Sequence, residues 1–276
     1  MNRGFSIGKL LTYVAAAVFL FVVLFPYVWM GATSIQVEID VYKMPPFPFR
    51  EVAFTTEYYG RLFTYSPFVQ AIGNSAIVAV MTTAFVMTAG SLGAYAMARM
   101  RFKGNKILLQ AVVLFYMLPG VAMLIPAIVV LRTIGLMDTL LGVMLGHSIF
   151  VLPLMTWMLT GIFASVPPDI EEAAQIDGRT RIGVLFRIIF PLTITGVALV
   201  TVFTFIISWN ELMFSSVIAV RNFKMLQPVI LELMGPIRTP VPQIAASGVI
   251  SSLPVIVLAV VLQRYIIRGI MRGAIK

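Results

Sequence analysis

Very few side chains in this sequence combine a reactive group with a setting in which that group could do chemistry. The 276 residues include one histidine, His147, and no cysteine, so thiol chemistry and a disulfide framework are excluded. His147 lies inside an uncharged apolar stretch, and Glu211 lies near the end of another. Buried ionisable groups serve as proton or ion relays in ion-coupled transporters. Their scarcity here favours a neutral role for His147, in helix packing or pore lining.

The motifs that bind nucleotide phosphates or a catalytic metal are also missing. A phosphate-binding loop has the pattern G-x-x-x-x-G-K-[ST], whereas Gly8-Lys9 lacks the upstream glycine and is followed by Leu10. There is no H-E-x-x-H motif and no cluster of histidines or carboxylates within the apolar stretches. We therefore expect a chain that is not an enzyme and binds no cofactor or metal of its own.

One polar segment, Val166–Pro191, has the pattern of two short helices between apolar stretches. The first helix begins at two prolines, which end the preceding stretch. Acidic residues occupy its first turns, where the positive end of the helix dipole favours them; they are Asp169, Glu171 and Glu172. Ala173 and Ala174 then give the helix a small-residue face that another protein can approach closely.

A turn and a second amphipathic helix complete this segment. Asp177-Gly178 predicts a turn or helix C-cap, because glycine adopts positive φ without strain. The second helix is expected to begin near Thr180, and Pro191 marks entry into the next apolar stretch. Its predicted apolar stripe consists of Ile182, Leu185, Phe186 and Ile189. Simple connectors seldom carry this much structure, so the segment is either a solvated hairpin or a docking surface.

The elements that position these residues are apolar helices. Hydrophobic residues make up 60% of the chain and charged residues only 11%, against about 25% charged in soluble domains. Several uncharged stretches reach the ~20 residues that cross a hydrocarbon core, where open sheets would leave backbone groups unpaired. We predict an all-α polytopic membrane protein, residues 1–276 forming one domain. The six expected spans are roughly 7–32, 68–98, 107–131, 139–163, 188–212 and 244–262.

The basic residues gather on one side of these spans. If the N-terminus is cytoplasmic, the cytoplasmic segments hold 13 basic and 4 acidic residues, and the outer segments hold 7 of each. The positive-inside rule therefore predicts cytoplasmic N- and C-termini and places the segment 166–187 in the cytoplasm. The same distribution accounts for the net charge of +9 without nucleic acid as a partner. The first apolar stretch is too long for a signal-peptide core, so we expect it to be retained.

Two outer segments and several small residues complete the predicted architecture. The aromatic stretch Glu57–Tyr65 predicts a short helix at the membrane interface. The segment 213–243 contains four prolines and cannot be one helix. Gly90, Ser91 and Gly93 in the second span, like a similar cluster in the sixth, would let helices approach closely or line a pore.

The spacing within the segment 166–187 and just beyond it resembles a known motif. Glu172-Ala173-Ala174, Gly178, Ile188 and Pro191 match the EAA motif of ABC importer permeases in residue type and spacing. In that family this loop is a coupling helix that sits in a cleft of the ATPase subunit. The resemblance implies that Glu172 pairs with a basic residue of the ATPase. The residues that it assigns to ATPase coupling are Glu171, Glu172, Ala173, Ala174, Asp177, Gly178, Ile188 and Pro191.

Further matches extend the resemblance over most of the chain, to the carbohydrate-uptake, MalG-like permeases. In chain order they are Asn74-Ser75, Ala94–Arg99, Phe102-Lys103-Gly104, Leu118-Pro119, Pro126, Gly135-Leu136, Asp138-Thr139 and Trp209-Asn210-Glu211. The last three residues would lie near the translocation path, where they either contact solute or hold helices together. The tail, residues 263–276, resembles one that reaches between two ATPases, and the tail residues assigned to this contact are Arg268, Gly269, Gly273 and Lys276.

The resemblance also implies a set of partners and a function. An outer loop before the last span would probe the binding protein through Leu231, Met234, Gly235, Pro236 and Arg238. The implied chain is a type I ABC importer permease in a bacterial or archaeal inner membrane. It would form half of the path for a sugar or sugar-like solute delivered by an extracytoplasmic substrate-binding protein. Its other partners would be the lipid bilayer, a second, MalF-like permease subunit and a cytoplasmic ABC ATPase dimer that holds ATP and Mg.

Two other functional classes remain open on the residues alone. An ion-coupled secondary transporter or channel would transport without ATP and would depend on His147 or Glu211. A scaffold that only recruits an ATPase would transport nothing in any assembly.

Overall fold

Every regular element is a helix in the computed structural model, which describes residues 7–100, 102–235 and 240–273. The long helices are α1 (Ile7–Ser34), α4 (Ser66–Arg99), α7 (Leu140–Ala164) and α14 (Val241–Gly273). The shorter ones are α2 (Glu38–Val41), α3 (Glu57–Thr64), α5 (Asn105–Tyr116), α6 (Gly120–Thr133), α8 (Pro168–Ile176), α9 (Arg181–Val184), α10 (Phe190–Leu192), α11 (Ile194–Trp209), α12 (Met213–Ile218) and α13 (Leu226–Glu232). A π-helical turn, Leu185–Ile189, joins α9 to α10.

Four helices are each long and apolar enough to cross a membrane, and six spans result if each of two bent helix pairs is counted as one. The expected third span is not a continuous helix: α5 and α6 meet at a bend of 100°. Pro119 explains this break, because it lacks a donor N–H and disfavours helical backbone in the residue before it. The expected fifth span is also bent, by 92°, between the helical stretch ending at Leu192 and α11.

The chain divides into two compact units, of which the first comprises Met1–Val69 and Ile230–Leu253. Within this unit none of the apolar window of α1 is buried against the rest of the chain, as fits a helix surrounded by lipid or another subunit. Near its end, the Ser34 hydroxyl lies 2.7 Å from the Tyr59 hydroxyl of α3. The aromatic stretch Glu57–Tyr65, predicted to be a short helix, is helical over α3.

A carboxylate organises the segment between α1 and α3. Asp40 accepts hydrogen bonds from Lys43 Nζ at 3.0 Å, Arg50 Nη2 at 2.9 Å and the Ala53 N–H at 3.0 Å. The backbone hydrogen bond from Ala53, followed by the one from the Lys43 ammonium, lowers the pKa of the Asp40 carboxyl. The segment is thus held by this ion-pair cluster together with an isolated antiparallel β-bridge between Gln36 and Phe54.

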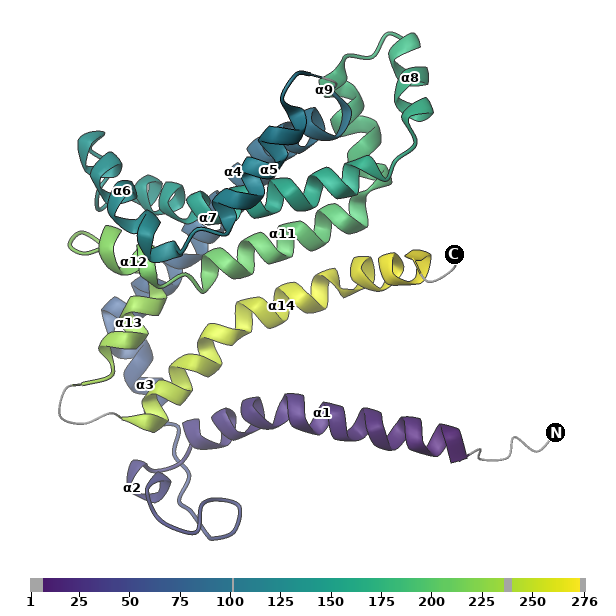
Figure 1. Cartoon of the computed structure of the whole chain (residues 1–276). Helices are drawn as coiled ribbons and strands as arrows, with labels where there is room; N and C mark the ends of the chain where they lie inside the picture. The colour runs from purple at the N-terminus through teal and green to yellow at the C-terminus, as the bar shows by residue number, and fades with distance from the viewer. Residues whose placement is uncertain (1–6, 101, 236–239, 274–276) are drawn as a thin grey trace. The chain divides into compact units, whose positions relative to one another are not determined.

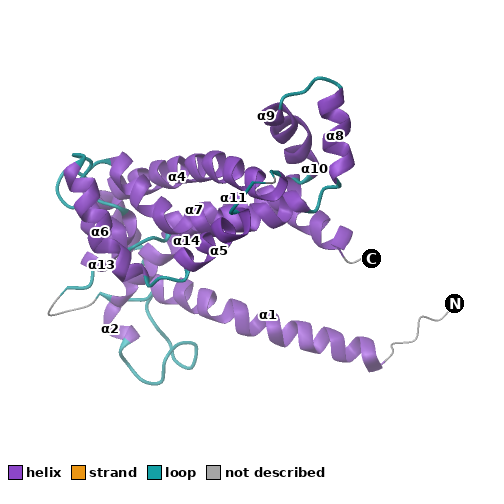
Figure 2. Cartoon of the chain, turned by 45° about the horizontal axis from the view of Figure 1, so that its top comes forward, coloured by secondary structure: helices purple, strands orange, loops and turns teal. Residues whose placement is uncertain are grey.

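The second unit, Gln70–Val229 and Pro254–Lys276, is built around α7. Helices α4, α7 and α11 run side by side in Figures 1 and 2, with α8 and α9 at one end and α6 and α12 at the other. Half of the apolar window of α7 is buried, the largest share of the four long helices. One apolar cluster surrounds its C-terminal half and a second surrounds its N-terminal half. Both clusters pack side chains of other helices onto α7.

Small residues allow close helix contacts at the places predicted for them. A Cβ atom built on Gly90 of α4 would lie 3.2 Å from Thr156 Oγ1 of α7. In the first unit, a Cβ atom on Gly248 of α14 would lie 2.9 Å from Met30 Sδ of α1. At both positions a Cβ atom would require the facing side chain to shift, so these glycines lie at close helix contacts.

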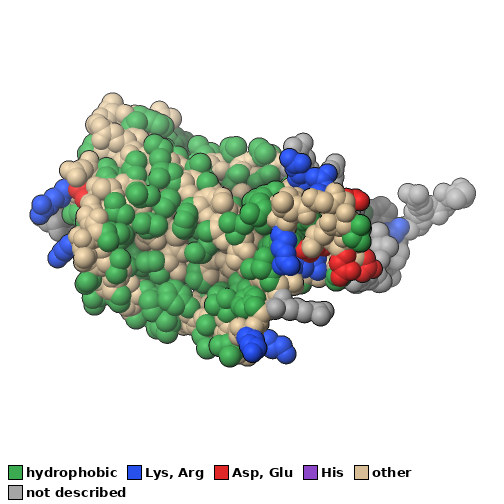
Figure 3. All heavy atoms as spheres, turned by 90° about the horizontal axis from the view of Figure 1, so that it is seen from above, with side chains coloured by type: hydrophobic (Ala, Val, Ile, Leu, Met, Phe, Trp, Pro, Cys, Tyr) green, Lys and Arg blue, Asp and Glu red, His purple; other side chains and the backbone are tan. Residues whose placement is uncertain are grey.

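Charged side chains gather near the two ends of the second unit. Figure 3 shows basic and acidic side chains both over the α6 and α12 end and around α8, with a mixture of hydrophobic and other uncharged surface between them. This separation is the pattern expected of a helix bundle whose middle lies in hydrocarbon.

Candidate coupling site

The polar segment after α7 forms a pair of short helices. The helix α8 carries Asp169 and Glu171 in its first turn. Gly178 follows with φ +81°, a conformation that a larger residue adopts only with strain. The Thr180 side chain then accepts a hydrogen bond from the Gly183 N–H at 3.2 Å and caps α9. The two-helix hairpin, its glycine turn and the start of its second helix near Thr180 all agree with the sequence-based prediction.

The residues expected to contact an ATPase do not all face outward. Glu172 and Ala173 are exposed on α8. Ala174 is buried in the apolar cluster around the C-terminal half of α7, so the prediction that both alanines present a face to another protein is wrong for Ala174. Glu171 is also buried, with 7% of its surface exposed. The helix rotates by about 100° per residue, which places adjacent members of this motif on different faces.

The remaining predicted coupling residues lie around the turn and the start of the next helical stretch. Asp177 and Pro191 are exposed, and Ile188 is partly buried. The predicted apolar stripe is split, because Leu185 and Ile189 are fully buried whereas Ile182 is 62% exposed. Phe186, within the π-helical turn, is also exposed. Two apolar residues of the predicted stripe therefore lie on the outer surface of the hairpin.

Glu171 enters a network that the sequence analysis did not foresee. Its carboxylate accepts a hydrogen bond from the Tyr95 hydroxyl of α4 and another from Gln175 Nε2 at 3.3 Å. Arg99, the last residue of α4, places Nε 3.3 Å from Glu171 Oε2. Arg99 Nη2 also donates to the carbonyl oxygens of Phe163 and Val166, at 2.8 and 2.5 Å. Tyr95 and Arg99 belong to a motif recognised in the sequence, but their spacing from residue 171 gave no sign of this contact.

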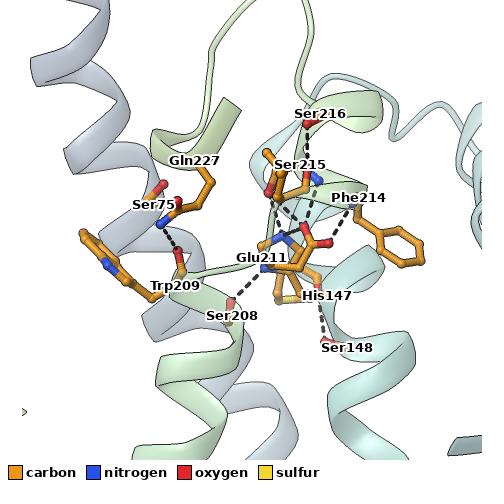
Figure 4. A network of polar contacts seen from close by, with 12 residues as sticks. Ser75, His147, Ser148, Ser208, Trp209, Glu211, Phe214, Ser215, Ser216 and Gln227 are labelled. Carbon is orange, nitrogen blue, oxygen red and sulfur yellow. Dashed lines mark hydrogen bonds and ion pairs between the residues drawn. The ribbon is translucent and has the colours of Figure 1, made fainter. Parts of the chain in front are cut away.

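A second polar network lies toward the other end of α7 and includes the only histidine. Figure 4 shows His147 between two serines and a glutamate. Its Nδ1 lies 2.8 Å from Ser208 Oγ, and its Nε2 lies 3.0 Å from Ser215 Oγ and 3.1 Å from Glu211 Oε2. The Glu211 carboxylate also accepts hydrogen bonds from the backbone N–H groups of Phe214 and Ser215. The two ionisable groups thus join α7 to the α11–α12 junction.

The three residues expected near the translocation path have different surroundings. Trp209 is 2% exposed, and Glu211 is engaged as described, so both hold helices together. Asn210 is exposed, and its Nδ2 donates to the Ile206 carbonyl at 2.9 Å. Gln227 Nε2 lies 3.4 Å from Asn210 Oδ1. Of the three, only Asn210 presents an accessible side chain.

An aspartate between α6 and α7 forms a clamp between two segments that are distant in sequence. Asp138 Oδ1 accepts from the N–H groups of Val220 and Arg221, and Oδ2 from that of Asn222, at 3.0, 3.0 and 2.7 Å. Burial raises the pKa of the Asp138 carboxyl, but these three hydrogen bonds outweigh it, so that the pKa is lowered. Its backbone has φ +57°. The clamp ties the α6–α7 turn to the segment after α12.

Some predicted site residues lie outside the described part of the chain. Pro236, Arg238 and Lys276 are among these, and the side chains of Arg268, Gly269 and Gly273 are likewise not described, although α14 extends to Gly273. Of the predicted binding-protein loop, Leu231 and Met234 are each 49% exposed, and Gly235 is partly buried. These two apolar side chains are therefore accessible beside α13.

The helical architecture defines a class of membrane protein. A bacterial ABC transporter involved in the import of the acidic polysaccharide alginate contains a chain that superposes with a TM-score of 0.79 at 22% identity, covering 96% of this chain and 98% of that one. The fold is that of a type I ABC importer permease.

The sequence comparison identifies the family. The family described as "Binding-protein-dependent transport system inner membrane component" matches residues 87–272. The chain belongs to this family and is a transport permease, an inner-membrane component rather than an enzyme. The sulfoquinovosyl glycerol transport system permease protein SmoH of Agrobacterium fabrum is 33% identical, over 99% of this chain and 96% of its own. The trehalose transport system permease protein SugB of Mycobacterium tuberculosis is 31% identical, over 92% of each chain.

Proposed function

We propose that this chain is the permease subunit of an ATP-driven importer and forms half of the translocation path for a sugar or sugar-like solute. The observation that carries the proposal is the hairpin of α8 and α9, which presents Glu172 and Ala173 at one end of an apolar helix bundle. The sequence contains no phosphate-binding loop, so nucleotide would have to be bound by another subunit. An ordered surface hairpin is suited to receive movement from such a subunit.

The proposal includes three protein partners. A cytoplasmic ABC ATPase dimer, which would hold ATP and Mg, docks on the hairpin with a basic residue opposite Glu172. The tail residues Arg268, Gly269, Gly273 and Lys276 would contact the same dimer. A second, MalF-like permease supplies the other half of the path, and an extracytoplasmic binding protein delivers solute near Leu231–Gly235. The family description, which specifies binding-protein-dependent transport, supports the last partner.

The proposed orientation places both termini and the hairpin in the cytoplasm. The chain has no natural cysteine, so single cysteines can report sidedness without background. Ile176 on α8 is 86% exposed and Val220 after α12 is 53% exposed. An impermeant maleimide applied to intact cells should label Val220→Cys and leave Ile176→Cys unlabelled until the membrane is opened. The reverse pattern would contradict the orientation.

The sugar class rests on the relatives. Two permeases that share about a third of the sequence over nearly the whole chain are named for sulfoquinovosyl glycerol and trehalose. Further relatives are named for trehalose/maltose and for diacetylchitobiose. All four named solutes contain a sugar unit, which supports a glycoside or oligosaccharide as the transported solute.

The geometry around His147 favours this function over ion-coupled transport. Both ring nitrogens lie within hydrogen-bond distance of protein groups, and His147 is 1% exposed. A relay needs a group that can exchange protons with a water-filled path, whereas this side chain joins α7 to the α11–α12 junction. The arrangement supports a structural role for the only histidine.

Reconstitution tests the proposal directly. The chain would be co-expressed with its partner permease, ATPase and binding protein, purified as a complex and placed in liposomes. Labelled trehalose, maltose and diacetylchitobiose would be offered through the binding protein, with ATP inside or outside. We expect uptake of at least one sugar that requires ATP on the side of α8. Uptake driven by an ion gradient without ATP, or a complex that hydrolyses ATP but moves no sugar, would contradict the proposal.

A further inference from the structure

The buried carboxylate of Glu171 connects the coupling hairpin to a helix that is distant in sequence. Tyr95 and Arg99 lie one turn apart at the end of α4, more than 70 residues before Glu171, and both contact its carboxylate. Tyr95 is 3% exposed, and the Arg99 and Glu171 side chains are each 9% exposed. Residues at i and i+4 lie on the same face of a helix, so α4 presents both groups together toward α8.

Arg99 makes this contact a three-helix junction. Its Nη2 group donates to the carbonyl oxygens of Phe163, in the last turn of α7, and Val166, in the link to α8. The final carbonyl groups of a helix have no partner within the helix, and a cationic side chain there also complements the helix dipole. One guanidinium therefore holds the end of α7, while its Nε faces the carboxylate on α8.

Apolar packing surrounds this junction. Ala174, one turn after Glu171, belongs to the same buried cluster as Tyr95, Phe163 and Val166. The cluster continues through Val184, Leu185 and Ile189 into the helical stretch beyond the hairpin. The ion pair is thus shielded from water on a packed surface, where its geometry is well fixed.

A contribution to stability alone does not account for a buried ion pair at this place. The desolvation of two buried charges offsets most of their attraction, and apolar residues of similar size often stabilise a protein equally well or better. An ion pair does, however, specify one relative position of the two helices, because displaced charges would remain buried and unpaired. The chain itself connects α8 directly only to α7 and α9. The polar contact adds α4.

We propose that Tyr95, Arg99 and Glu171 form a lock that makes α8 move as one body with the adjoining ends of α4 and α7. Movement imposed on α8 by the ATPase then reaches α4, which has no direct chain connection to the hairpin. This inference rests on the proposed function, and it assigns the three side chains a positioning role in energy coupling. Glu172, the next residue, faces the partner, whereas Glu171 faces the chain's own helices.

The first test compares two neighbouring carboxylates on α8 in the reconstituted complex. Glu171→Gln keeps the shape of the side chain and removes its charge, whereas Asp169→Asn makes the same change on an exposed side chain. We expect the amount of trehalose, or other transported sugar, moved per ATP hydrolysed to fall about tenfold in Glu171→Gln, in the range of typical coupling free energies. Asp169→Asn should match the wild-type ratio of sugar moved to ATP hydrolysed. In both variants the ATPase subunits should remain bound in the complex.

The second test restores the connection without the ion pair. Because the chain has no natural cysteine, Tyr95→Cys and Glu171→Cys can be combined in one variant. A reducible bis-thiosulfonate linker that spans the two side chains would then join them. The partner subunits would be cysteine-free. We expect uncoupled ATP hydrolysis before linking, a return toward the wild-type sugar-to-ATP ratio after linking, and loss again on reduction. A merely structural role would not respond to a linker added after assembly.

Three outcomes decide the inference. A normal sugar-to-ATP ratio in Glu171→Gln, or a linked double variant that stays uncoupled, would overturn the lock while leaving the importer function intact. A wild-type complex without ATP-driven uptake would overturn the proposed function, and the lock with it. The ratio falling in Glu171→Gln and returning only with the linker would establish the lock.

Discussion

Replacing Asp138 with alanine should loosen the end of the bundle at α6 and α12, because one carboxylate organises two segments there. The carboxylate accepts three backbone hydrogen bonds, from Val220, Arg221 and Asn222, at 2.7 to 3.0 Å. Hydrogen bonds to a charged acceptor contribute about 1.5–3 kcal/mol each when well buried. Asp138 is partly exposed, so solvent screening reduces this to roughly 1 kcal/mol per bond. We expect the bonds to contribute about 3 kcal/mol in total.

The backbone of residue 138 adds a second contribution that matched variants can separate. At φ +57° alanine costs roughly 1 kcal/mol more than glycine, whereas Asp and Asn adopt this conformation more readily. Asp138→Ala should therefore lower the free energy of unfolding by about 4 kcal/mol and Asp138→Gly by about 3. Asp138→Asn should cost about 2 kcal/mol, since its amide oxygen can still accept while its NH₂ group opposes one N–H donor.

The same clamp predicts a dependence on pH. The folded-state pKa of Asp138 is lowered, so its contribution is fully present above the unfolded-state pKa of about 3.9 and is lost as the pH falls through the folded-state value. The stability difference between wild type and Asp138→Asn should be constant near neutrality and should shrink below about pH 4.

Equilibrium unfolding in detergent micelles titrated with SDS would measure these differences. Asp169→Asn serves as the control, because it removes an exposed carboxylate elsewhere in the same unit. Values for Asp138→Ala and Asp138→Gly that both lie within about 0.5 kcal/mol of wild type, the range of ordinary surface substitutions, would refute the argument. A difference between wild type and Asp138→Asn that grew with acidification would refute the sign of the pKa shift.

Three other substitutions test separate features. Glu172→Arg places like charges at the proposed ATPase contact, so ATPase stimulation and uptake should be lost while the unfolding midpoint is unchanged; normal uptake would contradict the contact. Gly142→Ala should destabilise by more than about 3 kcal/mol in the same SDS titration, because its Cβ would lie 2.0 Å from the Leu136 carbonyl oxygen and backbone must move. His147→Gln should weaken the junction with Glu211 yet leave the sugar-to-ATP ratio unchanged. If uptake were driven by an ion gradient and disappeared in this variant, His147 would instead be a proton or ion relay.

The sequence was sufficient for the features that depend on local pattern. Long apolar stretches predicted α1, α4, α7 and α14, because length and hydropathy alone decide whether a helix can cross hydrocarbon. The two-helix hairpin was predictable because its turn, Asp177-Gly178, is local. The break between α5 and α6 falls at Pro119, inside the single span expected there, and the bend before α11 was predicted only as an entry point at Pro191. A proline shows where a helix is interrupted, but neighbouring helices set the angle.

The contacts that hold the site together were not predictable, for a different reason. Tyr95 and Arg99 meet Glu171, and Asp138 meets the segment after α12, across separations of more than 70 residues. Neither pairing leaves a periodic signal in the sequence. The burial of Ala174 had the same origin, because only the packing of α8 against α4 and α7 decides which alanine of the pair is covered.

The adjacent residues Glu171 and Glu172 together suggest how a short hairpin can transmit force. Successive side chains on a helix point about 100° apart, so two neighbouring carboxylates can serve different faces. Glu171 is held by two side chains of α4, and Glu172 is exposed toward the proposed ATPase. A helix that slid or rotated freely under the ATPase would move Glu172 without moving the bundle. A helix fixed on its inner face converts the same displacement into movement of α4 and α7. For this reason the two carboxylates should respond differently to removal of charge. Loss of charge at residue 172 should weaken docking of the ATPase, whereas loss of charge at residue 171 should preserve docking but uncouple transport.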